Sequence, residues 1–145
     1  MPHSYNKIWI HAIYATKDRA PLITLDTEQV IYDHIRDQLI ELGCPVKIIN
    51  GMPEHVHLLF LLNPQKAVSD VLKQIKEDTT HWINEQNLTK EKFAWQKDHA
   101  AYSISESQLG KVYNYILNQK QHHKKKTFTQ EYESFIKLHG FDLDV

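Results

Sequence analysis

The chain has 145 residues, of which 41% are hydrophobic and 24% charged, as expected for one soluble globular domain. A single cysteine, Cys44, excludes an internal disulfide, and no apolar run approaches the ~20 residues that a membrane helix needs. The formal net charge of −1 is unlike the basic excess of most nucleic-acid-binding proteins. We therefore expect residues 1–145 to form one domain in a reducing cytoplasm, without a signal peptide and without membrane contact.

Residue patterns along the chain predict four strands and four helices. In chain order these elements are strand 7–16, helix 25–42, strand 45–50, strand 54–62, helix 67–84, strand 95–103, helix 106–122 and helix 127–139. Asp26 is the expected cap of the first helix and Gly43 its C-terminal glycine. Thr127 and Gln130 have the spacing of a capping box for the last helix, and Gly140 is its expected end.

The element order β-α-β-β-α-β, followed by two more helices, predicts an α+β fold. Its expected form is the ferredoxin-like split βαββαβ arrangement, an antiparallel sheet with helices on one face. A tyrosine-bearing helix and a C-terminal helix follow that core. Many unrelated activities use this architecture, so the function has to be argued from particular side chains.

Two histidines on the third predicted strand form the clearest motif. Residues two apart on a strand point to the same face, so His55 and His57 are expected side by side, with Cα atoms roughly 6.5–7 Å apart. Two imidazoles at this spacing can bind one metal ion. The same pattern also fits two histidines on a solvent-exposed sheet face. Barrel enzymes with a His-x-His motif are disfavoured, because this chain is too short and about half of it has helical patterns.

The third predicted helix contains a second motif. Leu109, Val112, Tyr113 and Ile116 recur with helical spacing and form its expected core stripe. Tyr115 lies beside that stripe, with Gln119 four residues further on the same face. By itself this pair also fits an ordinary half-exposed aromatic residue next to a polar one.

Taken together, these motifs resemble those of the small single-tyrosine transposases of bacterial insertion sequences, members of the HUH endonuclease superfamily, and of related palindrome-associated tyrosine transposase-like proteins. Four segments carry the resemblance, which extends from the first strand to Phe141: His55-Val56-His57, Trp95-Gln96 with the strand end 102–105, Tyr115 to Gln119, and His122 to Phe128 with the closing helix.

The resemblance implies a DNA transposase that cleaves and rejoins single-stranded DNA at hairpins through a 5′-phosphotyrosine. Tyr115 is then the nucleophile, and His55, His57 and Gln119 bind a divalent cation, Mg²⁺ or Mn²⁺. It further implies a homodimer, with the active site formed within one subunit or shared between two, in the bacterial cytoplasm at the nucleoid. Neutral histidine and amide ligands leave the cation its full Lewis acidity.

Residues 120–126 contain no acid and are rich in lysine, so they are candidate phosphate contacts or, equally, a solvated helix end; the lysines are Lys120, Lys124, Lys125 and Lys126. The residue patterns are also compatible with two other functions. One is a catalytically silent nucleic-acid-binding regulator with the same fold, and the other is a ferredoxin-like ligand sensor. Retention of all four site residues counts against the silent regulator.

Overall fold

The computed structural model describes residues 4–122, 129–131 and 133. In this part of the chain, four strands and four α-helices are present, together with two short 3-10 turns at Lys17–Arg19 and Glu106–Gln108. The strands are β1 (Trp9–Ala15), β2 (Val46–Met52), β3 (His55–Leu61) and β4 (Ala100–Ile104). The helices are α1 (Glu28–Glu41), α2 (Val68–Glu85), α3 (Leu109–Leu117) and α4 (Gln119–His122).

The strands form one sheet in the order β2-β3-β1-β4, and every neighbouring pair is antiparallel. This order and the chain connectivity confirm the ferredoxin-like βαββαβ prediction. The two central strands, β1 and β3, pair along their whole length, from Trp9 opposite Leu61 to Ala15 opposite His55. The histidine motif therefore lies at the centre of the sheet, where both neighbouring strands hold its backbone.

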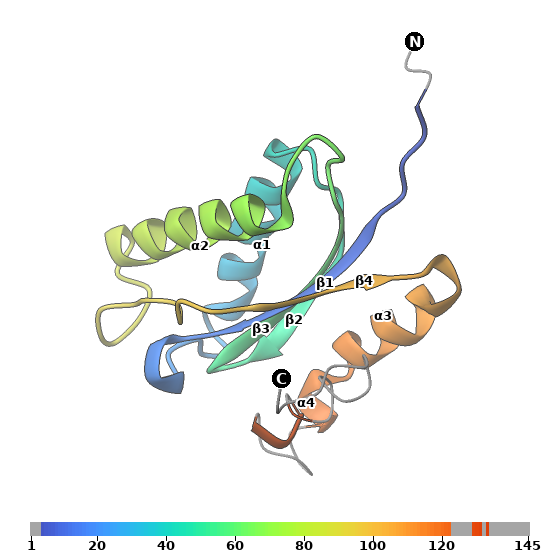
Figure 1. The fold of residues 1–145 in the computed structure, drawn as a ribbon. Coiled ribbons are helices and arrows are strands. Elements are labelled where there is room, and N and C mark those ends of the chain that lie inside the picture. Colours follow the sequence, from blue (N-terminus) through green and yellow to red (C-terminus); the bar gives the residue numbers. More distant parts are fainter. Residues whose placement is uncertain (1–3, 123–128, 132, 134–145) are drawn as a thin grey trace.

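Both faces of the sheet are covered. As Figure 1 shows, α1 and α2 lie on one face, as predicted, while α3 and α4 lie on the opposite face. Alternate residues of β3, namely Val56, Leu58 and Phe60, are fully buried in the larger core that involves α1 and α2. Leu59 points the other way and packs in a second core with α3. The period of two on a strand then places His55 and His57 on the α3 face.

One face of helix α1 is buried in the larger core. Ile31, Ile35 and Leu39 are completely buried there and Tyr32 nearly so, whereas Val30 is 48% exposed. The helix begins after Thr27 rather than at the predicted cap Asp26. Its end is as predicted: Gly43 has a φ of +78°, and the amides of Gly43 and Cys44 donate to the carbonyls of Ile40 and Leu39. These bonds form a Schellman motif, which only glycine enters at low cost.

Two predicted boundaries are wrong. The fourth strand starts at Ala100 instead of residue 95, because Trp95 makes only an isolated bridge to Thr16. The Trp95 ring is buried edge-on against the rings of Tyr14 and Phe93, 4.7 Å from each centroid. The predicted helix 106–122 is divided into a 3-10 turn, α3 and α4.

The last predicted helix lies mostly outside the described residues. Residues 129–131 and 133 of the predicted 127–139 span are helical, whereas Thr127 and Gly140 fall outside the described ranges. None of the helices in the described ranges has the length and apolar character required to cross a bilayer.

Gly51 offers a stability test of the β2–β3 hairpin. A Cβ at this position would lie 2.2 Å from the His55 carbonyl oxygen and 2.9 Å from the Val56 Cα, both rigid backbone atoms. We expect Gly51→Ala to lower the free energy of unfolding by about 3 kcal/mol, because the paired strands must separate to admit the methyl group. Chemical denaturation measures this. Gly110→Ala is the control, because a Cβ there meets nothing within 4 Å, and alanine favours helix. Equal stability of the two variants would contradict the prediction.

Candidate functional site

The histidine pair is buried between the sheet and the elements that cover it. The exposed fractions of His55 and His57 are 0% and 1%, and their ring centroids lie 5.1 Å apart. The interpretation of these residues as two solvated histidines on an open sheet face is therefore wrong. On the same face, His57 lies opposite Asn50 of β2 and Ile13 of β1.

Each histidine has a partner at its Nδ1 atom. His55 Nδ1 lies 3.1 Å from Glu54 Oε1, and His57 Nδ1 lies 2.9 Å from His11 Nε2. When both Nδ1 atoms donate their proton to these partners, both Nε2 atoms keep a lone pair that is available to a cation. His11 therefore has more than a packing role, since it orients His57 from β1 with its ring stacked on that of His57 at 5.2 Å.

Tyr115 and Gln119 are brought to the same place, but not by one continuous helix. Helix α3 ends at Leu117, and Asn118 has non-helical angles of φ −96° and ψ +21°. Asn50 Nδ2 donates to the carbonyl oxygens of Ile116 and Leu117, at 3.0 and 3.2 Å. Strand β2 thereby satisfies the last carbonyls of α3, which stabilises the helix end. The predicted single helix is wrong at this point, although Tyr115 and Gln119 still face a common site.

The Gln119 amide lies between His55 and Glu131 and contacts both side chains. Its Oε1 lies 3.2 Å from His55 Nε2, and its Nε2 donates to Glu131 Oε1 at 3.0 Å. The side chain is completely buried. Tyr115 donates its hydroxyl hydrogen bond to the same Glu131 oxygen, and its ring lies 5.8 Å from that of His57. All four sequence-predicted residues are thus brought together within one chain.

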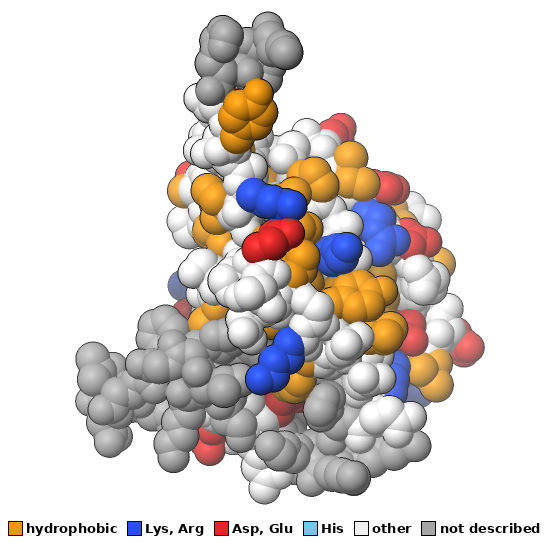
Figure 2. Space-filling model, turned by 90° about the vertical axis from the view of Figure 1, so that its right-hand side faces the viewer, with side chains coloured by type: hydrophobic (Ala, Val, Ile, Leu, Met, Phe, Trp, Pro, Cys, Tyr) orange, Lys and Arg blue, Asp and Glu red, His pale blue; other side chains and the backbone are white. Residues whose placement is uncertain are grey.

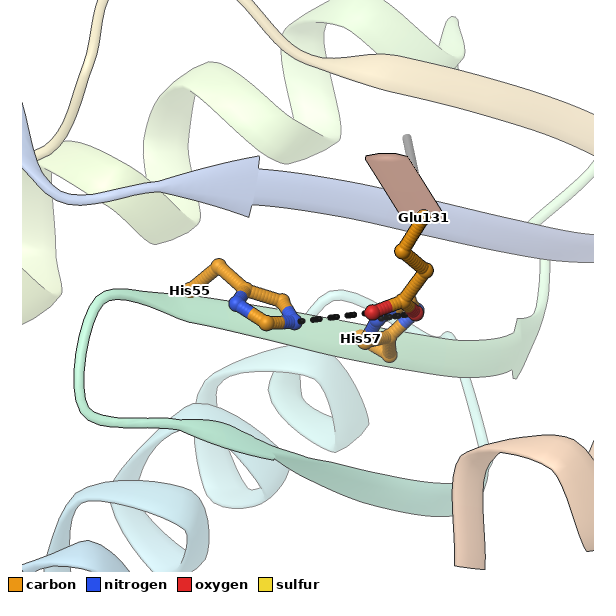
Figure 3. Close-up of side chains that lie close together, drawn as sticks. All are labelled: His55, His57 and Glu131. Carbon is orange, nitrogen blue, oxygen red and sulfur yellow. Dashed lines mark ion pairs between the residues drawn. The ribbon is translucent and has the colours of Figure 1, made fainter. Parts of the chain in front are cut away.

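Glu131 is a further residue of the candidate site, and it belongs to none of the sequence motifs. Its side chain is 5% exposed, and Oε1 lies 3.2 Å from His57 Nε2, while Oε2 lies 4.0 Å from His55 Nε2. Figure 3 shows both imidazole rings on β3 turned toward this carboxylate, which comes from the C-terminal segment. A lone acid in a predicted helix has no spacing that marks it as functional, so no signal in the sequence identified it.

Burial and close contacts shift the pKa values of Tyr115 and Glu131 in opposite directions. Burial raises the pKa of Tyr115, and the hydrogen bond to the Glu131 carboxylate and its negative charge raise it further. Burial also acts to raise the pKa of Glu131, but the adjacent His57 imidazole, when it is protonated, and hydrogen bonds from Tyr115 and Gln119 hold it well below its usual value. At neutral pH the site therefore contains an ionised carboxylate and a neutral phenol.

The donor set fits a divalent cation. Ligand atoms of His55, His57 and Glu131 all lie within 4.8 Å of one another, and the Gln119 amide oxygen adjoins His55. Imidazole, amide and carboxylate donors together suit ions such as Mn²⁺ better than sulfur-preferring metals. The Nδ1 contacts of both histidines also match the outer carboxylate or hydrogen-bond partners that orient metal-binding imidazoles.

The predicted DNA-contacting lysines are only partly described. Lys120 donates to Glu28 Oε2 at 2.9 Å, to Asn50 Oδ1 at 3.3 Å and to the Gly51 carbonyl oxygen. Lys124, Lys125 and Lys126 lie outside the described residues. On the face drawn in Figure 2, the described Lys and Arg side chains lie among acidic and hydrophobic ones.

A histidine–hydrophobic–histidine strand at the centre of a ferredoxin-like sheet, faced by a helix tyrosine, defines the single-tyrosine class of HUH endonucleases. The profile of the family described as "Transposase IS200 like" matches residues 4–119. The chain belongs to this family of transposases, enzymes that cleave DNA and transfer strands.

Individual relatives agree with this assignment. The ISDra2 transposase TnpA of Deinococcus radiodurans is 28% identical over 115 residues, which cover 75% of this chain and 81% of the relative. A crystal structure of a protein assigned as a transposase from Deinococcus radiodurans R1 superposes with a TM-score of 0.65 at 23% identity, covering 82% of this chain and 95% of that one. The structure of a REP-associated tyrosine transposase bound to a REP hairpin superposes with a TM-score of 0.64 at 17% identity, covering 85% and 73%. These two structures share the fold.

Proposed function

We propose that this transposase cleaves single-stranded DNA beside a hairpin and rejoins it through a 5′-phosphotyrosine on Tyr115. One observation carries the proposal: the Tyr115 hydroxyl and the Nε2 atoms of His55 and His57 converge on one carboxylate, so a nucleophile and a cation site are adjacent. The solved relative bound to a REP hairpin supports a hairpin as the DNA partner.

The chemistry explains why a tyrosine is required. The Tyr115 oxygen attacks phosphorus, a new P–O bond forms to the phenol, and the bond to the 3′ oxygen breaks. The phenol loses one proton, and the departing 3′ oxygen gains one. Because the energy of the phosphodiester is kept in the phosphotyrosine, a 3′-hydroxyl can reverse the reaction without ATP.

The cation addresses the main obstacle to this reaction. A free tyrosine has a pKa of about 10, so roughly one molecule in a thousand is phenolate at pH 7, and the pKa of Tyr115 is raised above that value. A bound Mg²⁺ or Mn²⁺ would favour the phenolate and polarise the scissile phosphate. His55, His57 and Gln119 would hold it, with Nδ1 of each histidine engaged by Glu54 or His11.

The proposal includes DNA contacts and a homodimer. Lys120 would exchange its contact with Glu28 for a contact with a DNA phosphate. Lys124, Lys125 and Lys126 would contact further phosphates of the same DNA strand. Since Tyr115 reaches His57 of its own chain in this structure, we favour a dimer with one complete site in each subunit over a site shared between subunits.

A covalent-adduct assay tests the function. We expect the protein, incubated with Mn²⁺ and a single-stranded oligonucleotide that carries an imperfect hairpin, to form a complex that survives denaturation. Any imperfect palindrome identified beside the gene in its genome is the first substrate to test. Omission of the metal with added chelator, and a fully duplex oligonucleotide, are the controls. Hairpin binding with no adduct under any metal condition would favour the catalytically silent regulator instead.

A further inference from the structure

We propose that Glu131 is itself a ligand of the divalent cation, so that the C-terminal segment supplies a carboxylate to the histidine pair. This inference deepens the proposed function and rests on it for the existence of the cation site. The resemblance implied only neutral protein ligands, two imidazoles and an amide. A carboxylate changes the charge of the site and links it to a fourth element of the fold.

The distances carry the inference. Ligands about 2.1 Å from an octahedral ion lie roughly 3 Å from their neighbours and roughly 4.2 Å from the ligand opposite. His57 Nε2 to Glu131 Oε1 is 3.2 Å, His55 Nε2 to Gln119 Oε1 is 3.2 Å, and His55 Nε2 to Glu131 Oε2 is 4.0 Å. The first two separations match those of neighbouring ligands of one ion, and the third matches that of opposite ligands.

The burial of Glu131 points in the same direction. The Glu131 side chain is 5% exposed, so its carboxylate has lost nearly all of its water, which is costly unless charge or hydrogen bonds compensate. Its described partners at this place are Tyr115, Gln119 and the two imidazoles. A divalent cation bound by the lone pairs of both Nε2 atoms would add a positive charge directly beside this carboxylate.

Coordination by Glu131 would also connect the cation to the nucleophile. The Tyr115 hydroxyl donates to Glu131 Oε1, so the nucleophile is one hydrogen bond from a proposed ligand atom. The Gln119 amide makes the second such link, from His55 to Glu131. Binding of the cation would thus fix Tyr115, Gln119 and the C-terminal segment relative to β3.

The test is the affinity of the DNA-free protein for Mn²⁺, measured by isothermal titration calorimetry and by electron paramagnetic resonance of free Mn²⁺. Glu131→Gln keeps the size of the side chain and removes its charge. We expect this variant to bind Mn²⁺ about ten- to a hundredfold more weakly. Glu131→Asp, which keeps the carboxylate, should recover part of the affinity. Glu133→Gln is the matched control, because Glu133 is exposed and lies two residues away; it should bind within twofold of wild type.

Each outcome decides the matter. Unchanged affinity in Glu131→Gln, with wild-type thermal unfolding, would show that Glu131 is not a ligand. Tighter binding would show that Glu131 occupies the position of the cation and competes with it. An unfolded Glu131→Gln would leave Glu131→Asp to decide by its affinity. Unchanged or tighter Mn²⁺ binding by Glu131→Gln is compatible with metal-dependent adduct formation by the wild type. Either result would therefore overturn this inference without overturning the proposed function. Absence of Mn²⁺ binding by wild type would overturn this inference and the cation site together.

Discussion

The Tyr115→Phe variant is expected to lose strand cleavage and adduct formation, with a rate reduction on the order of 10⁴- to 10⁶-fold, as for removal of a nucleophile in other covalent enzymes. Phenylalanine retains the ring that packs near His57 but lacks the oxygen that attacks phosphorus. The rate of cleavage of a labelled hairpin oligonucleotide and the yield of denaturant-resistant complex measure the effect.

The fold should survive this substitution. Loss of the hydroxyl removes one hydrogen bond to the Glu131 carboxylate, which costs about 1–3 kcal/mol. Tyr113→Phe is the matched control. Tyr113 lies on the same helix, its ring is 6.0 Å from the Lys47 ammonium, and it packs in the smaller core. We expect its cleavage rate to stay close to wild type. An adduct that persists in Tyr115→Phe would place the nucleophile elsewhere, and its loss in Tyr113→Phe would make Tyr113 the first candidate.

The second large effect is expected for His57→Ala. We expect it to lower cleavage by at least about a thousandfold and to leave hairpin binding near the wild-type level, because the imidazole serves the cation and not the DNA backbone. Cleavage rate and binding affinity for the same hairpin, measured side by side at fixed salt, test this separation.

His57 is buried, so its removal also affects stability. The substitution leaves a cavity and takes a partner from both His11 and Glu131, and we expect a cost of about 2–4 kcal/mol. His57→Gln, which fills more of the space, serves as a second variant. His81→Ala is the control, since His81 lies on α2 with 82% of its side chain exposed and pairs only with the nearby Glu85 among the described ion pairs. Loss of hairpin binding in both His57 variants, with unfolding excluded by circular dichroism, would contradict the assignment.

Mixed subunits extend this test to the assembly. If each site takes His57 and Tyr115 from one chain, a mixture of His57→Ala and Tyr115→Phe subunits contains no complete site and stays inactive. If the site is shared, the mixed dimer has one intact site, and activity reappears on mixing. The measurement is cleavage after the two variants are co-expressed and purified through different tags.

Much of the fold is predictable because its determinants are local. The alternation of β3 places Val56, Leu58 and Phe60 on one face and His55 and His57 on the other, whatever the rest of the chain does. The helical stripe through Ile31, Ile35 and Leu39 and the positive φ at Gly43 are local in the same sense. Where the predictions are wrong, a contact with a distant element decides the outcome. Asn50 on β2 binds the carbonyls that end α3, and the burial of Trp95 against Tyr14 keeps residues 95–99 out of the fourth strand.

By itself, the sequence determined the class of fold, the common face of His55 and His57, and the resemblance that pointed to Tyr115 and Gln119. Only the tertiary structure decided that His11 orients His57 across the β1–β3 pairing, and that Glu131 reaches the same site from the C-terminal segment. The physical reason is the range of each interaction. Side chains return to the same face every two residues in a strand and every 3.6 residues in a helix, so the residues that share a face of one element follow from their spacing. Contacts between separate elements depend on how the packed layers are arranged, and no spacing in the chain encodes them.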